Sequence, residues 1–289
     1  MALDQLKIVA QPKLSNATMV LGFGGWMDGG DVSTGTIEYL VDSFNAQILA
    51  QIAPEQFYIY SFPGSMEVSS LFRPHLKIEE GLVTEFKPPA NTFYYEQANN
   101  LVLFEGKEPN FNWSQFADCM FAVATAADVS AIYFIGSVGG MAPHTREPRL
   151  FSSVSHARIK YTLEAHGLNF TNYEGPGSFI SYLMTLADQR GFEMATIVAE
   201  IPPYVQGPNF KCIEAVARKL SAITAPPINL GDLRVLGDEL ENRINELVEK
   251  RPELAEQIRK LEEDYDNDIF DTQMGDLKIW LEEKGIRLE

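Results

Sequence analysis

The stretch TMVLGFGGWMDGGDVSTGT, residues 18–36, holds a strand, a turn and the start of a helix. Its first part, residues 18–23, is a short apolar run typical of a strand that is covered on both faces. A glycine-rich turn follows, and from residue 31 to residue 44 apolar side chains recur with the 3.6-residue period of a helix. A strand that runs through a short turn into a helix is the repeating unit of α/β proteins. The stretch therefore predicts that class.

The same alternation continues outward from this stretch. Further strands are predicted at residues 46–52, 57–62, 100–106, 131–136 and 195–201. Helices are predicted at residues 113–128, 153–166, 179–190 and 210–222. Strands that alternate with helices in this way predict a three-layer α/β/α domain.

Composition and charge limit the classes of partner that the chain is expected to bind. The chain has 289 residues, 45% of them hydrophobic, and a net charge of −17, so its field repels nucleic acid. Cys119 and Cys212 lie in apolar helical patterns, which indicates buried, reduced thiols. We find no metal-ligand spacing of cysteine and histidine, no long apolar run and no secretory signal pattern. The sequence predicts a cytoplasmic protein with no metal, no cofactor, no nucleic acid and no membrane partner.

The composition changes after the linker TAPPINLG, which ends at Gly231. We expect a main domain over residues 1–228 and an acidic helical extension over residues 229–289. Between residues 238 and 289 there are 17 acidic and 8 basic residues. Two apolar stripes predict two amphipathic helices, which must dock on the main domain or on another subunit. The residues expected to be buried there are Leu240, Ile244, Leu247, Ile258 and Leu261.

The glycine-rich turn after the first strand fits no specific phosphate-binding motif. A Walker alignment on Gly25 and Gly30 places Asp31 where the lysine belongs, and a dinucleotide alignment places Met27 at the third glycine. We interpret Asp31 as the N-cap of the following helix. Asp28 then needs a cationic partner, which Arg146 or Arg73 could supply.

A second stretch, GSVGGMAPHTREPRLF at residues 136–151, places His144 and Arg146 in a proline-rich loop after a strand. Loops of this kind often carry function. The residues are equally compatible with a loop that is held in place by its own hydrogen bonds.

Six motifs in order, GGWMDGG, SLFRPHL, FEGKEPNFNW, GMAPHTREP, YEGPGSF and EIPPYVQGPN, resemble the proteasome assembly chaperone two family in its prokaryotic branch. They cover residues 20–222, the whole main domain. The resemblance implies a phosphorylase/hydrolase-like α/β/α fold with a C-terminal helical appendage, and homo-oligomers among which a trimer is favoured.

The resemblance also carries candidate site residues onto this chain. Carboxyl ends of parallel strands meet at one edge of a sheet, and Asp28, Glu105, His144 and Arg146 follow predicted strands. We expect Asp28 to face His144 and Arg146 there, in a crevice that binds a ligand or in a polar latch that joins loops; both interpretations remain open. The full candidate set is Asp28, Arg73, Glu105, His144, Arg146, Glu174 and Tyr204, with loop backbone at Gly25, Gly29, Gly30, Gly175 and Gly177.

Two functions follow as hypotheses. The first is a non-enzymatic oligomeric scaffold or assembly-chaperone-like protein with a possible protein partner. The alternative is an enzyme with a nucleoside-phosphorylase-like crevice for a small phosphorylated or nucleoside-like substrate, in which His144 would act as acid or base and arginine would hold an oxyanion. Archaeal relatives use a hydrophobic-tyrosine-any tail, whereas this sequence has Leu288 at the penultimate position. That tail mechanism is therefore not expected here, and catalytic residues stay unknown.

Overall fold

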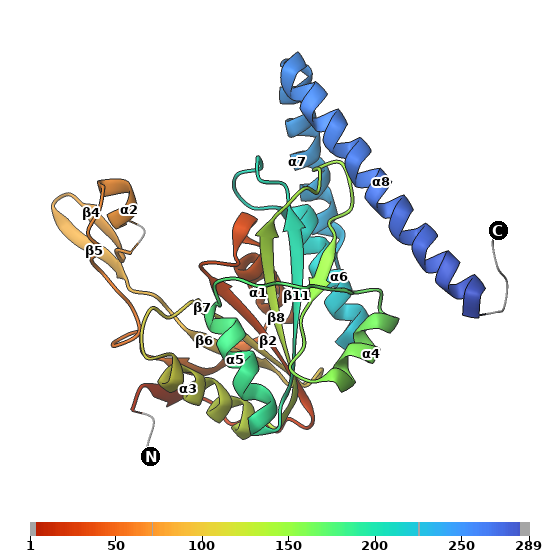
Figure 1. Ribbon diagram of the computed structural model, residues 1–289. Coiled ribbons are helices and arrows are strands. Elements are labelled where there is room, and N and C mark those ends of the chain that lie inside the picture. Colours follow the sequence, from red (N-terminus) through yellow and green to blue (C-terminus); the bar gives the residue numbers. More distant parts are fainter. Residues whose placement is uncertain (1–3, 71, 225, 284–289) are drawn as a thin grey trace.

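The computed structural model describes residues 4–70, 72–224 and 226–283, with side chains of the last helix described as far as Asp268. A large sheet forms the centre of the molecule (Figure 1). Its strand order is β1–β3–β6–β7–β2–β8–β11–β9–β10. These strands are β1 (Leu6–Ile8), β2 (Ala17–Gly24), β3 (Gln47–Ile52), β6 (Thr92–Glu96), β7 (Leu101–Lys107), β8 (Val129–Gly139), β9 (Leu150–Ser152), β10 (Asn169–Phe170) and β11 (Glu193–Ile201).

The middle of the sheet is parallel. β7, β2, β8 and β11 all run in one direction, whereas β6, β3 and β1 pair antiparallel on one side and β9 pairs antiparallel with β11 on the other. Parallel strands need both faces covered, which explains why β2 and β11 are apolar almost throughout. The carboxyl ends of the four parallel strands therefore lie at one edge of the sheet.

Helices cover both faces. The main helices are α1 (Val32–Phe44), α3 (Trp113–Ala126), α4 (Ala157–Ala165), α5 (Phe179–Ala187) and α6 (Phe210–Thr224). Successive residues of β2 point to opposite faces: Met19 packs in one core with α3 and α5, and Val20 packs in a second core with α1, α4 and α6. The predicted three-layer α/β/α domain is confirmed.

The chain ends in two further helices, α7 (Gly231–Glu249) and α8 (Pro252–Glu283). The predicted helical appendage is thus confirmed. α7 packs along α6 through Leu233, which is buried, and α8 buries Ile258 and Tyr265. Leu240, Ile244 and Leu261 are half-buried, whereas Leu247 is 58% exposed in the single chain, so its burial against another subunit stays a prediction. Leu247 lies in the last turn of α7, beyond the reach of the main domain.

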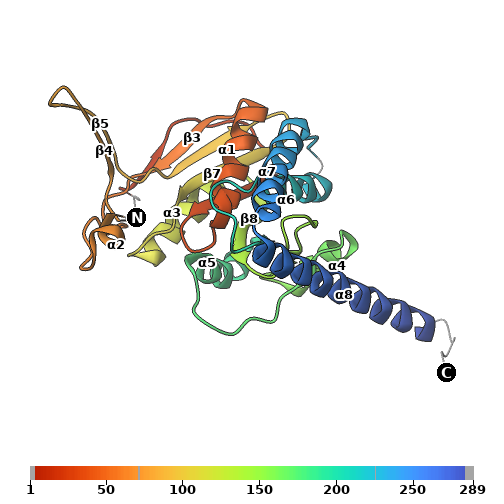
Figure 2. The ribbon, with the colours of Figure 1, turned by 90° about the horizontal axis from the view of Figure 1, so that it is seen from above.

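A separate arm, residues 60–87, stands away from the sheet on the side opposite the far end of α8 (Figure 2). It contains the short helix α2 (Met66–Ser70) and a hairpin of β4 (His75–Glu79) and β5 (Leu82–Lys87). None of these elements was predicted. The strand expected at residues 57–62 does not form, because the backbone there bonds to the loop at Asn110 instead of to a strand: the Phe57 carbonyl accepts from the Asn110 N–H, and the Ile59 N–H donates to the Asn110 side chain.

Candidate functional site

The turn after β2 positions Asp28 as the cap of α1. One carboxylate oxygen of Asp28 accepts from the backbone N–H groups of Ser33 (2.8 Å) and Thr34 (3.0 Å), and the other accepts from Thr34 Oγ1 (2.8 Å). Asp31 has a left-handed backbone and makes no capping bond with its side chain. The predicted capping role of Asp31 was therefore wrong, because the chain turns once more through η1 (Gly29–Asp31) and brings Asp28 to the orphan N–H groups.

These capping bonds also replace the cation that we expected beside Asp28. No ion pair to Asp28 is found within the described ranges, and the predicted Asp28–arginine contact was wrong. Burial raises the pKa of Asp28 in spite of its hydrogen bonds from Thr34 and Ser33. Burial also raises the pKa of Glu105 in β7, and repulsion from Glu38 and Asp28 adds to the shift. The arginines that follow β8 pair with other carboxylates, those of Glu200, Glu262 and Asp266.

The glycines of this turn are structural. A Cβ added at Gly29 would lie 2.5 Å from Cδ1 of Ile201, and Gly30 has a φ of +64° with Asn209 packed against it. A larger side chain at Gly29 would press on the end of β11, and one at Gly30 would press on Asn209 before α6 and would strain the backbone. Gly25 belongs to the same turn, while Gly175 and Gly177 lie in the exposed loop between β10 and α5.

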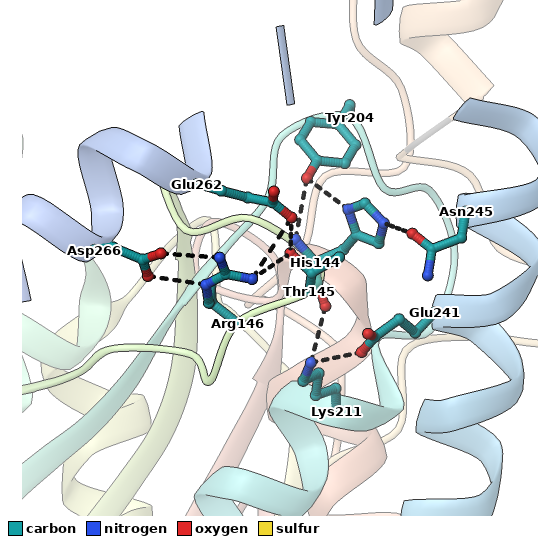
Figure 3. A network of polar contacts seen from close by, with 9 residues as sticks. All are labelled: His144, Thr145, Arg146, Tyr204, Lys211, Glu241, Asn245, Glu262 and Asp266. Atoms are coloured by element: carbon teal, nitrogen blue, oxygen red, sulfur yellow. Dashed lines mark hydrogen bonds and ion pairs between the residues drawn. The ribbon is translucent and has the colours of Figure 1, made fainter. Parts of the chain in front are cut away.

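The loop after β8, which we call the latch loop (residues 140–149), holds the C-terminal helices (Figure 3). His144 is 6% exposed, and its ring is held at both nitrogens: Nδ1 lies 2.9 Å from the Tyr204 hydroxyl and Nε2 lies 3.0 Å from Oδ1 of Asn245 in α7. The Tyr204 hydroxyl also accepts from the His144 backbone N–H. His144 therefore joins the loop after β11 to α7.

Arg146 extends the same connection to α8. Its guanidinium donates twice to Asp266, from Nε and Nη2, at 2.9 Å each, and Nη1 lies 3.6 Å from Glu262. This two-point geometry fixes orientation as well as distance. Thr145 donates to the same Glu262. Beside it, Lys211 of α6 bonds to the His144 carbonyl (3.0 Å) and to Glu241 of α7 (2.6 Å).

The most buried ion pair of the latch loop was missed from the sequence. Glu200, near the end of β11, is 8% exposed and accepts from Arg149 Nε at 2.6 Å and from the Met141 backbone N–H at 2.6 Å. Arg149 also reaches Asp268 and stacks over the Tyr265 ring, 4.8 Å from its centroid. The signal was present, because a glutamate inside the apolar run ATIVAEI requires a cationic partner.

The structure thus gathers only part of the candidate set. His144, Arg146 and Tyr204 belong to one network, whereas Asp28 lies in the turn after β2 and Glu105 lies in β7, with no hydrogen bond or ion pair to that network among the contacts described. Arg73 is exposed and lies just before β4 in the arm, and Glu174 is exposed in the loop before α5. The hollow beside His144 and Arg146 has a volume of about 20 Å³, enough for about one water molecule and no substrate.

Two further classes of group could carry chemistry, the thiols and the side chains that bind metals. Both cysteines are free and buried. Within residues 4–70, 72–224 and 226–283, no cluster of three histidine, cysteine or acidic side chains is arranged to hold a metal ion. None of the helices described for this chain combines the length and hydropathy needed to cross a bilayer.

Fold and loop together define a three-layer α/β/α protein whose C-terminal helical pair is bound by a loop at the strand ends. The chain belongs to the PAC2 family, whose model matches residues 22–248. No curated protein sequence matches it. The family predicted from the ordered motifs is therefore confirmed.

Solved structures agree with this assignment. A proteasome-assembly chaperone homologue from Mycobacterium tuberculosis is 27% identical over 83% of this chain and 98% of its own, with a TM-score of 0.72. A protein of unknown function from the same organism reaches a TM-score of 0.83 at 19% identity, covering 94% of this chain and 92% of its own. An archaeal proteasome activator from Pyrococcus furiosus has a TM-score of 0.63 at 17% identity, covering 84% and 97%. The last two similarities concern the fold alone.

Proposed function

We propose that this protein is a non-enzymatic, homo-oligomeric scaffold of the assembly-chaperone type, which acts by contacting other protein surfaces through its arm. The observation that carries the proposal is the exposure of apolar side chains there. Of the 21 large hydrophobic residues exposed in the described structure, nine lie between residues 60 and 86. Such a concentration marks a protein contact surface.

The hairpin of the arm has one apolar and one charged face. Directly paired residues share a face, and the pairs Leu76–Phe86 and Ile78–Val83 make one face apolar. The other face carries ion pairs, Lys77–Glu79 at 2.8 Å and Lys87–Glu85 at 2.6 Å. Leu76, Ile78, Val83 and Phe86 are 49–65% exposed. The charged face is stable in contact with water, whereas the apolar face would be stabilised by burial against a partner.

A second copy of the chain is the partner that the charges favour. A chain of net charge −17 repels its own copies, but residues 73–87 contain three basic and three acidic side chains and are neutral apart from His75. Copies can therefore approach closely at the hairpin. A lone two-stranded hairpin is also marginal in water, so a partner that is always present would stabilise it. The resemblance favours three copies.

The names given to the relatives support the assembly role. One relative at 27% identity is called a proteasome-assembly chaperone homologue, and a fold relative is called a proteasome activator. For this chain we propose the corresponding role, contact with proteasome subunits. A cytoplasmic location belongs to the same proposal.

The enzyme alternative receives less support from the geometry. Both ring nitrogens of His144 contact protein atoms, Arg146 is paired with two carboxylates, and the hollow beside them is too small for a nucleoside. A histidine that serves as acid or base must reach a substrate atom directly or through one water.

Light scattering coupled to size exclusion tests the oligomer. The parent should have the mass of three 32.3 kDa chains, and the double variant Leu76→Ser, Phe86→Ser should have a smaller mass. The matched control is Lys77→Ser, Glu85→Ser, which alters the directly opposite pair on the charged face and should keep the parent mass. Equal masses for parent and both variants would contradict the interface.

The chaperone role needs a separate measurement. Purified proteasome α-subunits should co-elute with the parent and assemble into rings faster in its presence. The absence of any complex and any change in ring yield would contradict the chaperone role while leaving the oligomer untouched.

A further inference from the structure

A large cleft lies at the carboxyl ends of the parallel strands and meets the latch loop at Glu200. Its volume is about 870 Å³, within the range of small-molecule sites. Trp26 and Met27, which follow β2, line it together with Val138 and Gly139 at the end of β8 and Val198 of β11. The opposite wall is formed by the loop of residues 171–178 and by α5.

The topology explains why a cleft opens there. From the carboxyl end of β2 the chain passes through α1 to β3, on one side of β2 in the sheet. From the carboxyl end of the neighbouring strand β8 it passes to β9, on the opposite side. Connections that diverge from neighbouring parallel strands leave a crevice at their carboxyl ends, where ligands of open α/β sheets bind.

The lining has almost no charge. None of the lysine, arginine or histidine side chains in the described ranges lines the cleft, and Glu200 is its one charged lining residue there. That carboxylate is already bound by Arg149 and by the Met141 N–H. A phosphate or another anion would be desolvated without a cation, which is unfavourable. The cleft thus disfavours the phosphorylated substrates of the enzyme hypothesis.

The cleft is lined by aromatic rings, apolar side chains and hydroxyl groups. Trp26 and Tyr173 are 72% and 66% exposed, and Ile180 and Met184 present apolar surface from α5. Eight serine and threonine side chains line the same space. Thr196, only 6% exposed, accepts a hydrogen bond from the Ser153 N–H, which leaves its own proton available for a ligand.

We infer that this cleft binds an uncharged small molecule that combines a ring system with hydroxyl or amide groups. The rings of Trp26 and Tyr173 would contact the ring, and hydroxyls such as that of Thr196 would hydrogen-bond the polar groups. This binding goes beyond the scaffold role, because it uses the sheet edge and not the arm.

Two dyes with the same ring system test the inference. Neutral N-phenylnaphthylamine should bind the full chain with one site per chain, and its sulfonate analogue, anilinonaphthalene sulfonate, should bind at least about tenfold more weakly because the cleft has no cation for it. Equal affinity for both dyes, or no binding of the neutral dye, would overturn the inference.

Variants locate the dye. Thr185→Trp and Met184→Trp fill the cleft from α5, and each should weaken binding of the neutral dye about tenfold. The melting temperature of Thr185→Trp should equal that of the parent, because the Thr185 side chain is exposed. Val83→Ser in the arm should leave binding unchanged. Loss only with Val83→Ser would place the dye on the arm and refute the cleft site. Dye binding that appears only in the double variant Leu76→Ser, Phe86→Ser would show that a second copy of the chain fills the cleft. That result would also refute the small-molecule site.

Discussion

The latch loop and the arm both extend from the central sheet, and they differ in how their side chains are used. In the latch loop, the side chains of His144, Thr145, Arg146 and Arg149 contact protein groups, most of them on α7 and α8. In the arm, the side chains on the apolar face of the hairpin are 49–65% exposed. The charged side chains of the latch loop, which stand out in the sequence, therefore stabilise the fold. The apolar side chains of the hairpin, which do not stand out in the sequence, are exposed and accessible to a partner.

The largest effect that would test this contrast is expected from Arg149→Ala. It leaves the buried Glu200 carboxylate without its cation, so the free energy of unfolding should fall by about 3 kcal/mol. Urea unfolding at fixed chain concentration measures it. Arg158→Ala is the control, since its pair with Glu193 is on the surface and should contribute less than about 1 kcal/mol. Equal losses in the two variants would argue against a structural latch.

A smaller loss is expected from Tyr265→Phe. The Tyr265 hydroxyl donates to the Glu147 carbonyl at 2.6 Å, and the residue is 8% exposed. Removing this bond between α8 and the latch loop should lower the free energy of unfolding by about 1 kcal/mol. Tyr161→Phe, at a residue that is 74% exposed, should change nothing measurable. An unchanged Tyr265→Phe variant would mean that α8 docks without this contact.

Arg146→Ala should have a weaker effect, and one that depends on pH. The hydrogen bond from Arg146 holds the pKa of Asp266 below its ordinary value of 3.8. A carboxylate with a lowered pKa in the folded state stabilises that state above its ordinary pKa, and the stabilisation is lost as the pH falls through the folded pKa. Because Asp266 is exposed, the loss should be smaller than for Arg149→Ala.

Unfolding of parent and Arg146→Ala across a pH series measures this effect. The difference between their free energies of unfolding should be largest near neutral pH and should shrink below about pH 3.8. A difference that stays constant into the acid range would show that Arg146 stabilises the protein by packing alone.

The smallest effect on the fold is expected from Val83→Ser on the apolar face of the arm. Val83 is 65% exposed, so at low chain concentration the free energy of unfolding should change by less than about 0.5 kcal/mol. Its effect should lie in association, so that the melting temperature rises less steeply with chain concentration than that of the parent. A loss comparable to that of Arg149→Ala would show that the arm is part of the core.

The central strands and covering helices could be predicted because their signals are local. Met19, Val20 and Leu21 are apolar in succession because both faces of β2 are covered. The arm could not be predicted, because Leu76, Ile78, Val83 and Phe86 alternate as in any half-buried strand and the alternation does not show that nothing covers them. The expected boundary between residues 228 and 229 stays a prediction.

The sequence by itself determined the α/β alternation, the helical extension and the family, since periodicity and ordered motifs can be read along the chain. Only the tertiary structure decided which groups meet. The His144–Asn245 and Arg146–Asp266 contacts join residues 101 and 120 positions apart. The Asp28 carboxylate accepts from backbone N–H groups five and six positions away and not from an arginine. Hydrophobic periodicity is a property of neighbouring residues, whereas a polar group takes whichever partner the packed chain brings within reach, and that depends on every contact in the fold.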